Sequence, residues 1–75
     1  MKFPDQFPPG CSFVASFSGD EFVEFPDGKV FKLSDDGAEL APAGRLPVKS
    51  AAFISEGKFL SLAASYRSAD ARNAA

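Results

Sequence analysis

Cys11 has the most reactive side chain in this sequence, and it stands alone. The chain has one cysteine and no histidine. A thiol nucleophile needs a neighbouring base, and structural zinc sites need several cysteine or histidine ligands. The serines have no histidine and no clear lysine to activate them. We therefore expect no catalytic residue, no metal site, no cofactor and no enzymatic activity, and we interpret Cys11 as a small apolar residue entering the first strand.

Carboxylates are the other groups that could do chemistry, and six of the seven in the first half of the chain lie within residues 20–36. Residues 35–37, Asp-Asp-Gly, do not match an EF-hand loop, which needs acidic ligands at fixed alternating positions and a glutamate at its end. Turn carboxylates most often keep a surface solvated. A weak Ca²⁺ or Mg²⁺ site and an acidic patch for a basic partner remain alternatives for this set, which is Asp20, Glu21, Glu24, Asp27, Asp35 and Asp36.

The formal charge is small overall but unevenly distributed. The net charge is −2 and the sequence pI is about 4.9. Residues 1–37 carry three lysines against seven carboxylates, a net of −4, whereas residues 38–75 carry five cations against three carboxylates, a net of +2. This balance argues against a dedicated nucleic-acid binder, which usually has a basic patch. A two-signed surface can instead steer a partner, or simply be solvated.

Phenylalanine dominates the apolar content, with nine rings among 75 residues and no tryptophan. A chain this short without a disulfide or metal must rely on dense packing or on association with another chain. Aromatic side chains on a sheet can also stack on single-stranded bases. The alternative function, a small-barrel binder of single-stranded nucleic acid, rests on the strand-borne rings Phe13, Phe17, Phe22, Phe25 and Phe31.

These side chains must be positioned by short strands separated by turns. Gly19, Gly28 and Gly37 mark turns nine residues apart, a spacing typical of short antiparallel strands. We predict an all-β fold of five or six short antiparallel strands in a meander, forming a strongly bent sheet or small barrel. The expected strands are residues 12–17, 21–25, 29–33, 38–41, 48–54 and 58–64.

The turn residues favour particular hairpin registers. Gly19-Asp20 suits a type II′ turn, which would set Phe17 opposite Phe22. Residues 26–28, Pro-Asp-Gly, fit a three-residue loop with Gly28 at positive φ, and Val23 then faces Phe31. A two-residue Asp-Gly turn would shift that register and exchange the faces of the strand. The sequence leaves both registers open.

The chain divides into an arm, a domain and a tail. Residues 1–10 contain three prolines and form an extended, Pro-rich N-terminal arm. Residues 11–64 form the β-rich domain, and residues 65–75 a weak helix or disordered tail whose last residues we expect to be mobile. Helical spacing also runs through Phe59, Leu62, Ala63 and Tyr66, so residues 58–72 can be read as strand or helix; we predict strand to about residue 63.

The expected core follows from those strands. A three-residue loop at residues 55–57 would pair Phe53 with Phe59. A bent sheet with bulges could bury most of the large apolar side chains, which are Phe13, Phe17, Val23, Phe25, Phe31, Leu33, Phe53, Ile54, Phe59, Leu60 and Leu62.

Without a site for chemistry, binding is the remaining class of function. We predict a non-enzymatic interaction module that binds another protein through a sheet edge or a Phe-bearing surface. The candidate partner-binding residues are Phe3, Phe7, Phe22, Arg45, Lys49, Tyr66 and Arg67. The partner can also be a second copy, because the arm could carry Phe3 and Phe7 to a neighbouring subunit.

Cell context follows from the same composition. An unpaired cysteine fits a reducing compartment, and no apolar run is long enough to span a membrane. We therefore expect a cytoplasmic protein without membrane contact. Its small size and general composition suggest a bacterial or phage accessory or structural protein.

Overall fold

A computed structural model describes residues 2–74, with side chains through residue 69. Met1 of the predicted arm and Ala75 of the predicted tail lie outside the described residues, as do the side chains from residue 70 onward. Five strands are followed by one helix: β1 (Ser12–Ser16), β2 (Glu21–Glu24), β3 (Val30–Leu33), β4 (Leu40–Ala43), β5 (Ala51–Ile54) and α1 (Glu56–Ala74).

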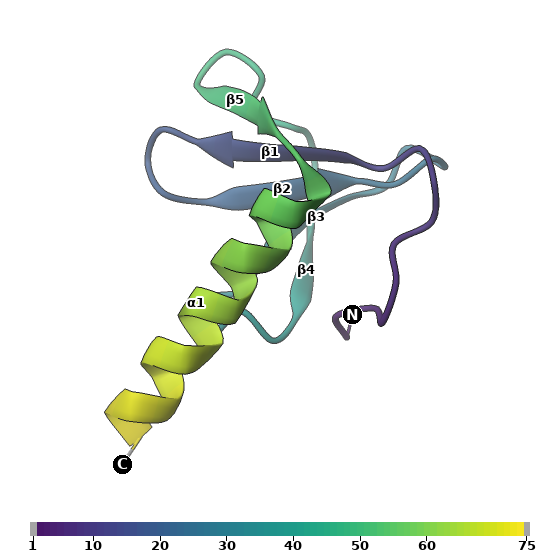
Figure 1. Cartoon of the computed structure of the whole chain (residues 1–75). Coiled ribbons are helices and arrows are strands. Elements are labelled where there is room, and N and C mark those ends of the chain that lie inside the picture. The colour runs from purple at the N-terminus through teal and green to yellow at the C-terminus, as the bar shows by residue number, and fades with distance from the viewer. Residues whose placement is uncertain (1, 75) are drawn as a thin grey trace.

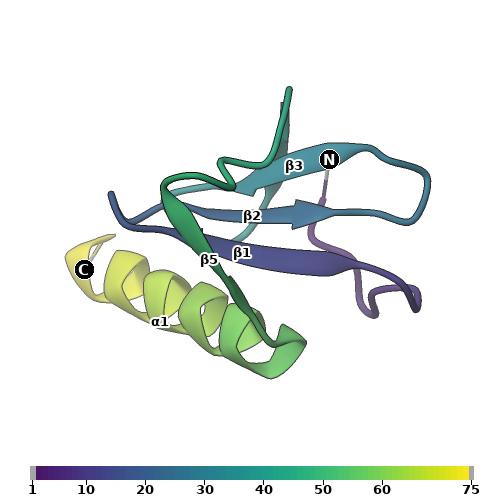
Figure 2. The same ribbon diagram turned by 90° about the horizontal axis from the view of Figure 1, so that it is seen from above.

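The strands form one antiparallel sheet in the order β4-β3-β2-β1-β5. Of the five or six short antiparallel strands predicted, five are present, and the sheet does not close into a barrel, because β4 and β5 lie at opposite edges and do not pair. Figure 1 shows β4 running at a steep angle to β1 and β2, and Figure 2 shows β5 crossing β1 obliquely before it enters α1. The fourth and fifth strands begin later than predicted, at Leu40 and Ala51.

The β1–β2 and β2–β3 hairpins both have three-residue loops. In the β2–β3 loop, Phe25 N–H donates to the Lys29 carbonyl at 2.8 Å, and Gly28 has a φ of +90°. Of the two registers that the sequence leaves open, the structure therefore has the three-residue loop, with Val23 paired with Phe31.

The predicted register of the first hairpin is wrong. Ser16 N–H donates to the Asp20 carbonyl at 2.7 Å, which leaves residues 17–19 in the loop. Phe22 then lies opposite Val14, and Phe17 is left at the tip of the hairpin. A left-handed Gly19 at the third loop position, with φ of +99°, suits this loop as well as it suits a type II′ turn.

Residues 58–64 are helical, which corrects the prediction of a sixth strand and of a Phe53–Phe59 pair. Ser55 caps the helix: its Oγ accepts a hydrogen bond from Lys58 N–H at 3.1 Å, and its carbonyl accepts one from Phe59 N–H at 3.0 Å. Phe59 and Ala63 are buried on the face of α1 that meets the sheet, with Leu62 and Tyr66 half-buried beside them. The helical spacing, together with the helix propensity of lysine, leucine and alanine in this segment, therefore outweighs the β propensity of Phe59.

The core lies between α1 and one face of the sheet. Phe7 reaches it from the N-terminal segment, with its ring centroid 5.0 Å from Phe13 and 5.8 Å from Phe59 in edge-on contacts. The buried cluster consists of Phe7, Phe13, Val23, Leu33, Leu40, Phe59 and Ala63. Of the predicted core, Phe25, Phe31 and Ile54 pack against this cluster, whereas Phe17, Phe53 and Leu60 are exposed, so their assignment to the core is wrong.

No helix within the described residues is long and apolar enough to cross a membrane.

Candidate functional site

The two edges of the sheet differ in how well they are protected. At the β4 edge, Lys2 forms an isolated antiparallel bridge with Glu39, immediately before the strand begins. Pro42 lies within β4 and pairs with Phe31. A proline has no N–H to offer a further strand, and natural edge strands are commonly blunted in this way. The β4 edge is therefore a poor template for another strand.

The β5 edge carries none of these devices. Its four residues, Ala-Ala-Phe-Ile, include no proline and no charge. Along its inner side β5 pairs with β1, with Ala15 opposite Ala52 and Phe13 opposite Ile54. Within the described part of the chain, no strand pairs with its outer side. An edge of this kind presents unpaired peptide groups to solvent.

The hydrogen-bonding alternation of the ladder shows which peptide groups face outward. Phe17 N–H donates to the Ser50 carbonyl at 2.9 Å, so this pair is hydrogen-bonded. In an antiparallel pair such positions recur at every second residue, which assigns Ala52 and Ile54 to the inner ladder. The N–H and C=O groups of Ala51 and Phe53 consequently point away from β1, toward the open edge.

Exposed apolar side chains gather beside this edge. Phe17 is 78% exposed, Phe53 70% and Val48 60%. Phe17 follows β1 and pairs with Ser50, while Val48 lies in the turn that leads into β5. We call Phe17, Val48 and Phe53 the β5 patch. The remaining large exposed apolar side chain among the described residues, Leu60, lies on α1 and is only 37% exposed.

The patch wraps around the open edge, because strand alternation places Phe17 on the face of Phe13 and Phe53 on the opposite face. Val14 follows the core residue Phe13 in β1 and therefore points to the opposite face, away from α1. Phe53 lies directly opposite Val14 and shares that face. Phe22, paired with Val14 on its other side, continues the row and is half-buried. Phe53 is thus the outermost ring of an apolar row that runs to the open edge.

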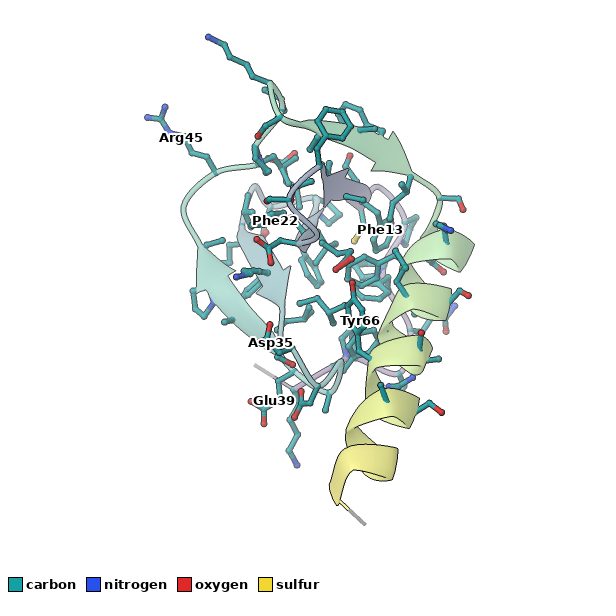
Figure 3. All side chains as sticks on the ribbon, turned by 90° about the vertical axis from the view of Figure 1, so that its left-hand side faces the viewer. Phe13, Phe22, Asp35, Glu39, Arg45 and Tyr66 are labelled. Atoms are coloured by element: carbon teal, nitrogen blue, oxygen red, sulfur yellow. The ribbon has the colours of Figure 1, made fainter. Side chains whose placement is uncertain are left out.

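Positive charge borders the patch. Arg45 and Lys49 lie in the connection between β4 and β5, and both are exposed. Figure 3 shows Arg45 projecting into solvent, on the side of the molecule away from Asp35 and Glu39. No carboxylate occurs in the sequence between Glu39 and Glu56. This end of the sheet is therefore locally cationic in a chain whose net charge is negative.

An open hollow of about 600 Å³ adjoins the far end of β5. The N-terminal segment contributes Pro8, Pro9 and Cys11 to its wall, and Phe53 and Glu56 line the side nearest the helix. Burial raises the pKa of the Cys11 thiol, with the charges of Glu56 and Asp27 adding to the effect. The thiol is therefore held protonated, which is the opposite of what nucleophilic chemistry requires.

The most buried carboxylate has a structural partner. Glu21 accepts a hydrogen bond from the Tyr66 hydroxyl, which points from α1 toward the sheet in Figure 3. This bond to Glu21, together with burial, raises the pKa of Tyr66 to about 12. The phenol is thus a neutral donor at ordinary pH, and the pair ties α1 to β2.

The other carboxylates do not converge. The Asp20 carboxylate lies 3.5 Å from the Lys32 ammonium. Asp36 accepts hydrogen bonds from the Ser34 hydroxyl and the Ala38 N–H inside its own turn, which lower the pKa of Asp36. Among the described residues no group of three acidic, cysteine or histidine side chains is placed to hold a metal ion.

The seven predicted partner-binding residues fall into separate places. Four of them contact the protein's own core or helix. Phe7 is buried, and the Phe3 ring stacks on the Phe59 ring with their centroids 6.1 Å apart. The Arg67 guanidinium carbon lies 5.5 Å from the centroid of the Phe3 ring, and the Tyr66 hydroxyl donates a hydrogen bond to Glu21. Phe22 lies in the row beside Val14. The structure brings Arg45 and Lys49 together with the β5 patch, whose residues Phe17, Val48 and Phe53 are not among the predicted binding residues.

Comparison with known proteins gives no relative. No family model, curated protein or solved structure matches this chain. The function must therefore be argued from the surface of the molecule.

Proposed function

We propose that this chain is a non-enzymatic interaction module that binds another protein at the outer edge of β5. The observation that carries the proposal is the difference between the two sheet edges. Pro42 and the Lys2–Glu39 bridge blunt the β4 edge. β5 instead leaves the peptide groups of Ala51 and Phe53 open beside the exposed rings of the β5 patch.

The energetics favour contacts that combine backbone and side chains. Burying three large apolar side chains at about 1.5–3 kcal/mol each contributes roughly 4.5–9 kcal/mol. Losing translational and rotational freedom on association costs about 4–15 kcal/mol. Apolar burial alone therefore does not secure a complex. Strand pairing at the open edge supplies the additional directional contacts, and exposed edges are used for this in many complexes.

Single-stranded nucleic acid is the competing ligand for exposed rings beside cations. Phe17 and Phe53 offer two stacking faces, but only Arg45 and Lys49 flank them. Among the other strand-borne rings that could stack, Phe13 is buried and the remaining three are half-buried. Two cations give a shallow salt dependence and little affinity for phosphates. Tight binding of oligonucleotides that weakens steeply with salt would therefore contradict the proposal.

The test compares two matched substitutions in the full chain. Phe53→Glu places a charge in the β5 patch, and Leu60→Glu places the same charge on the outer side of α1. The unmodified chain is used to capture its partner from its source cells. The captured protein is then purified and titrated by calorimetry against the unmodified chain and against both variants. We expect Phe53→Glu to weaken the reconstituted complex by at least about tenfold, a change of about 1.4 kcal/mol, and Leu60→Glu to leave it unchanged. Equal affinities for both variants would contradict the assignment of the site to β5.

A further inference from the structure

We infer that the occupant of the β5 edge is an extended segment of the partner that pairs antiparallel with β5 and carries apolar residues first and acidic residues last. This inference rests on the proposed function and specifies the chemistry of the ligand. The structure assigns a direction to the segment because the two ends of β5 differ in charge.

The backbone of β5 sets the spacing of the contacts. The outward-facing residues Ala51 and Phe53 are two positions apart, which is about 6.8 Å along an antiparallel strand. Each offers one N–H and one C=O, so an incoming strand can form up to four hydrogen bonds with the pair. Antiparallel pairing is the slightly more stable arrangement per residue and continues the antiparallel pattern of the whole sheet.

The side chains of β5 leave room for a neighbour. Ala51 and Ala52 are small, so side chains of an added strand can lie over them without displacement. Phe53 is exposed on the face away from α1 and gives an aromatic or β-branched residue a cross-strand partner. The residue opposite Phe53 is therefore expected to be apolar.

Charge determines which end of the segment is acidic. Lys49 precedes β5 by two residues, and Arg45 lies in the same connection; Glu56 follows β5 by two residues, in the first turn of α1. In an antiparallel pair the partner chain runs from the Glu56 end toward the Lys49 end. A carboxylate placed four residues after the one opposite Phe53 meets Lys49, whereas a carboxylate at the start of the segment meets Glu56.

A second copy of the chain fits the same edge less well. In a symmetric antiparallel pair of two β5 strands centred on Phe53, Lys49 lies opposite Gly57 of the other copy. If the pair is centred on Ala52, Lys49 lies opposite Ser55. Neither arrangement gives the cation a carboxylate partner on the same face of the ladder, so charge complementarity favours a different chain.

Synthetic peptides test the direction and the charge. The probe is the capped peptide Ser-Val-Thr-Phe-Thr-Val-Ser-Glu-Ser-Asp, in which Phe, Val and Glu are spaced to meet Phe53, Ala51 and Lys49. One control peptide has the reversed order, and a second has lysine in place of both acidic residues. Binding to the ¹⁵N-labelled full chain is followed by amide chemical shifts. We expect the largest shifts at Ala51 and Phe53, and affinities for both control peptides that are at least about tenfold lower.

Paired variants separate the contributions of charge and backbone. Arg45→Glu with Lys49→Glu is expected to reverse the preference between the acidic and lysine peptides, whereas Lys29→Glu with Lys58→Glu, which changes the net charge equally, is not. Ala51→Pro removes an outward N–H and is expected to abolish binding. Ala51→Val keeps the N–H and is expected to bind the peptide as the unmodified chain does. Circular dichroism verifies that each variant is folded.

The outcomes distinguish this inference from the proposed function. Equal binding of the three peptides, or shifts confined to another surface, would overturn the extended acidic segment. If the natural partner nevertheless remained sensitive to Phe53→Glu, the proposed function would stand without it. Concentration-dependent shifts of Ala51 and Phe53 without peptide would identify a second copy as the occupant and overturn the inference, as would a single-stranded oligonucleotide that displaced the peptide from these residues.

Discussion

Gly37 allows the β3–β4 turn to pack closely against α1. Its φ is +70°, and a β-carbon added there would lie 2.3 Å from the Ala63 carbonyl oxygen and 3.1 Å from the Tyr66 Cβ. Gly37→Ala therefore combines left-handed strain of about 1–2 kcal/mol with overpacking of about 1–3 kcal/mol. We expect a loss of roughly 2–5 kcal/mol in the free energy of unfolding, measured by urea denaturation.

Gly19 provides the matched control for this substitution. Its φ is +99°, but an added β-carbon would have no atom within 4 Å. Gly19→Ala should therefore cost only the conformational strain of about 1–2 kcal/mol. Equal losses for the two variants would mean that the turn does not pack against α1 as described.

Tyr66 reports on the buried bond to Glu21 because it is the single tyrosine in a chain without tryptophan. We expect its phenolate absorbance to titrate near pH 12 in the folded protein, compared with the ordinary value of 10.0. Glu21→Gln removes the negative charge and should bring the midpoint closer to 10. A wild-type midpoint at the ordinary value would contradict the hydrogen bond.

The same pKa shift affects stability in alkali. Because the pKa is raised on folding, the folded state holds the phenol proton more tightly than the unfolded state. The stabilisation is full below pH 10 and is lost as the pH rises from 10 to about 12. A shift of about two pKa units, at about 1.36 kcal/mol per unit, corresponds to a loss of roughly 2–3 kcal/mol. Tyr66→Phe should lack this loss when its urea midpoint is compared with that of the wild type across the window.

At the residue scale, the conformation of a turn can be predicted from the sequence, whereas the tertiary contacts of its residues cannot. Pro26 and Asp27 indicate a turn with Gly28 at positive φ, and the structure has it. Gly37 is recognisable as a turn residue, but its contact with Ala63 depends on where α1 lies. The burial of Phe7 likewise depends on Phe59, which is distant in sequence.

At the element scale, α1 depends on how it begins. Ser55 supplies the cap by accepting a hydrogen bond from the Lys58 N–H. Ser55→Ala is expected to lower the free energy of unfolding by about 1 kcal/mol. Ser61→Ala, at an exposed position inside the helix, should instead be neutral or slightly stabilising, because alanine is the better helix former. Thermal melts followed by the helical circular dichroism signal compare the two, and identical effects would contradict the cap.

Two signals compete in residues 58–64, which explains why the prediction of a strand there is wrong. Phe59 favours a strand by propensity, whereas Phe59, Leu62, Ala63 and Tyr66 share a helical face. Ser55 is typical of a turn, although a serine ahead of a helical pattern is also a capping signal. The cap and the shared face together favour the helix, and both can be read from the sequence.

The open edge predicts a pattern of amide exchange along β5. Ala52 and Ile54 donate to β1, whereas the N–H groups of Ala51 and Phe53 face solvent. We expect Ala51 and Phe53 to exchange at least about tenfold faster than Ala52 and Ile54 in the free protein. Residue-resolved hydrogen exchange by NMR measures this, and uniform protection along the strand would show that the outer side of β5 is already paired.

At the scale of the whole molecule, strand order decides which surface is available. The cations Arg45 and Lys49, which are among the predicted partner-binding residues, lie beside the β5 patch. Phe17 and Phe53 are expected in the core because apolar residues are usually buried. The exposure of Phe53 follows from two long-range facts, the edge position of β5 and the cover that α1 gives to one face alone, whereas Phe17 is exposed because it lies in the loop of the first hairpin. Neither fact is encoded in local sequence spacing.

We propose the outer edge of β5 as the place where this protein binds its partner. The most direct test is hydrogen exchange of the ¹⁵N-labelled chain, free and in complex with the purified partner. We expect the amides of Ala51 and Phe53 to gain protection in the complex, while those of Ala52 and Ile54 change little. Unchanged exchange at Ala51 and Phe53, with new protection on α1 or at the β4 edge, would contradict it.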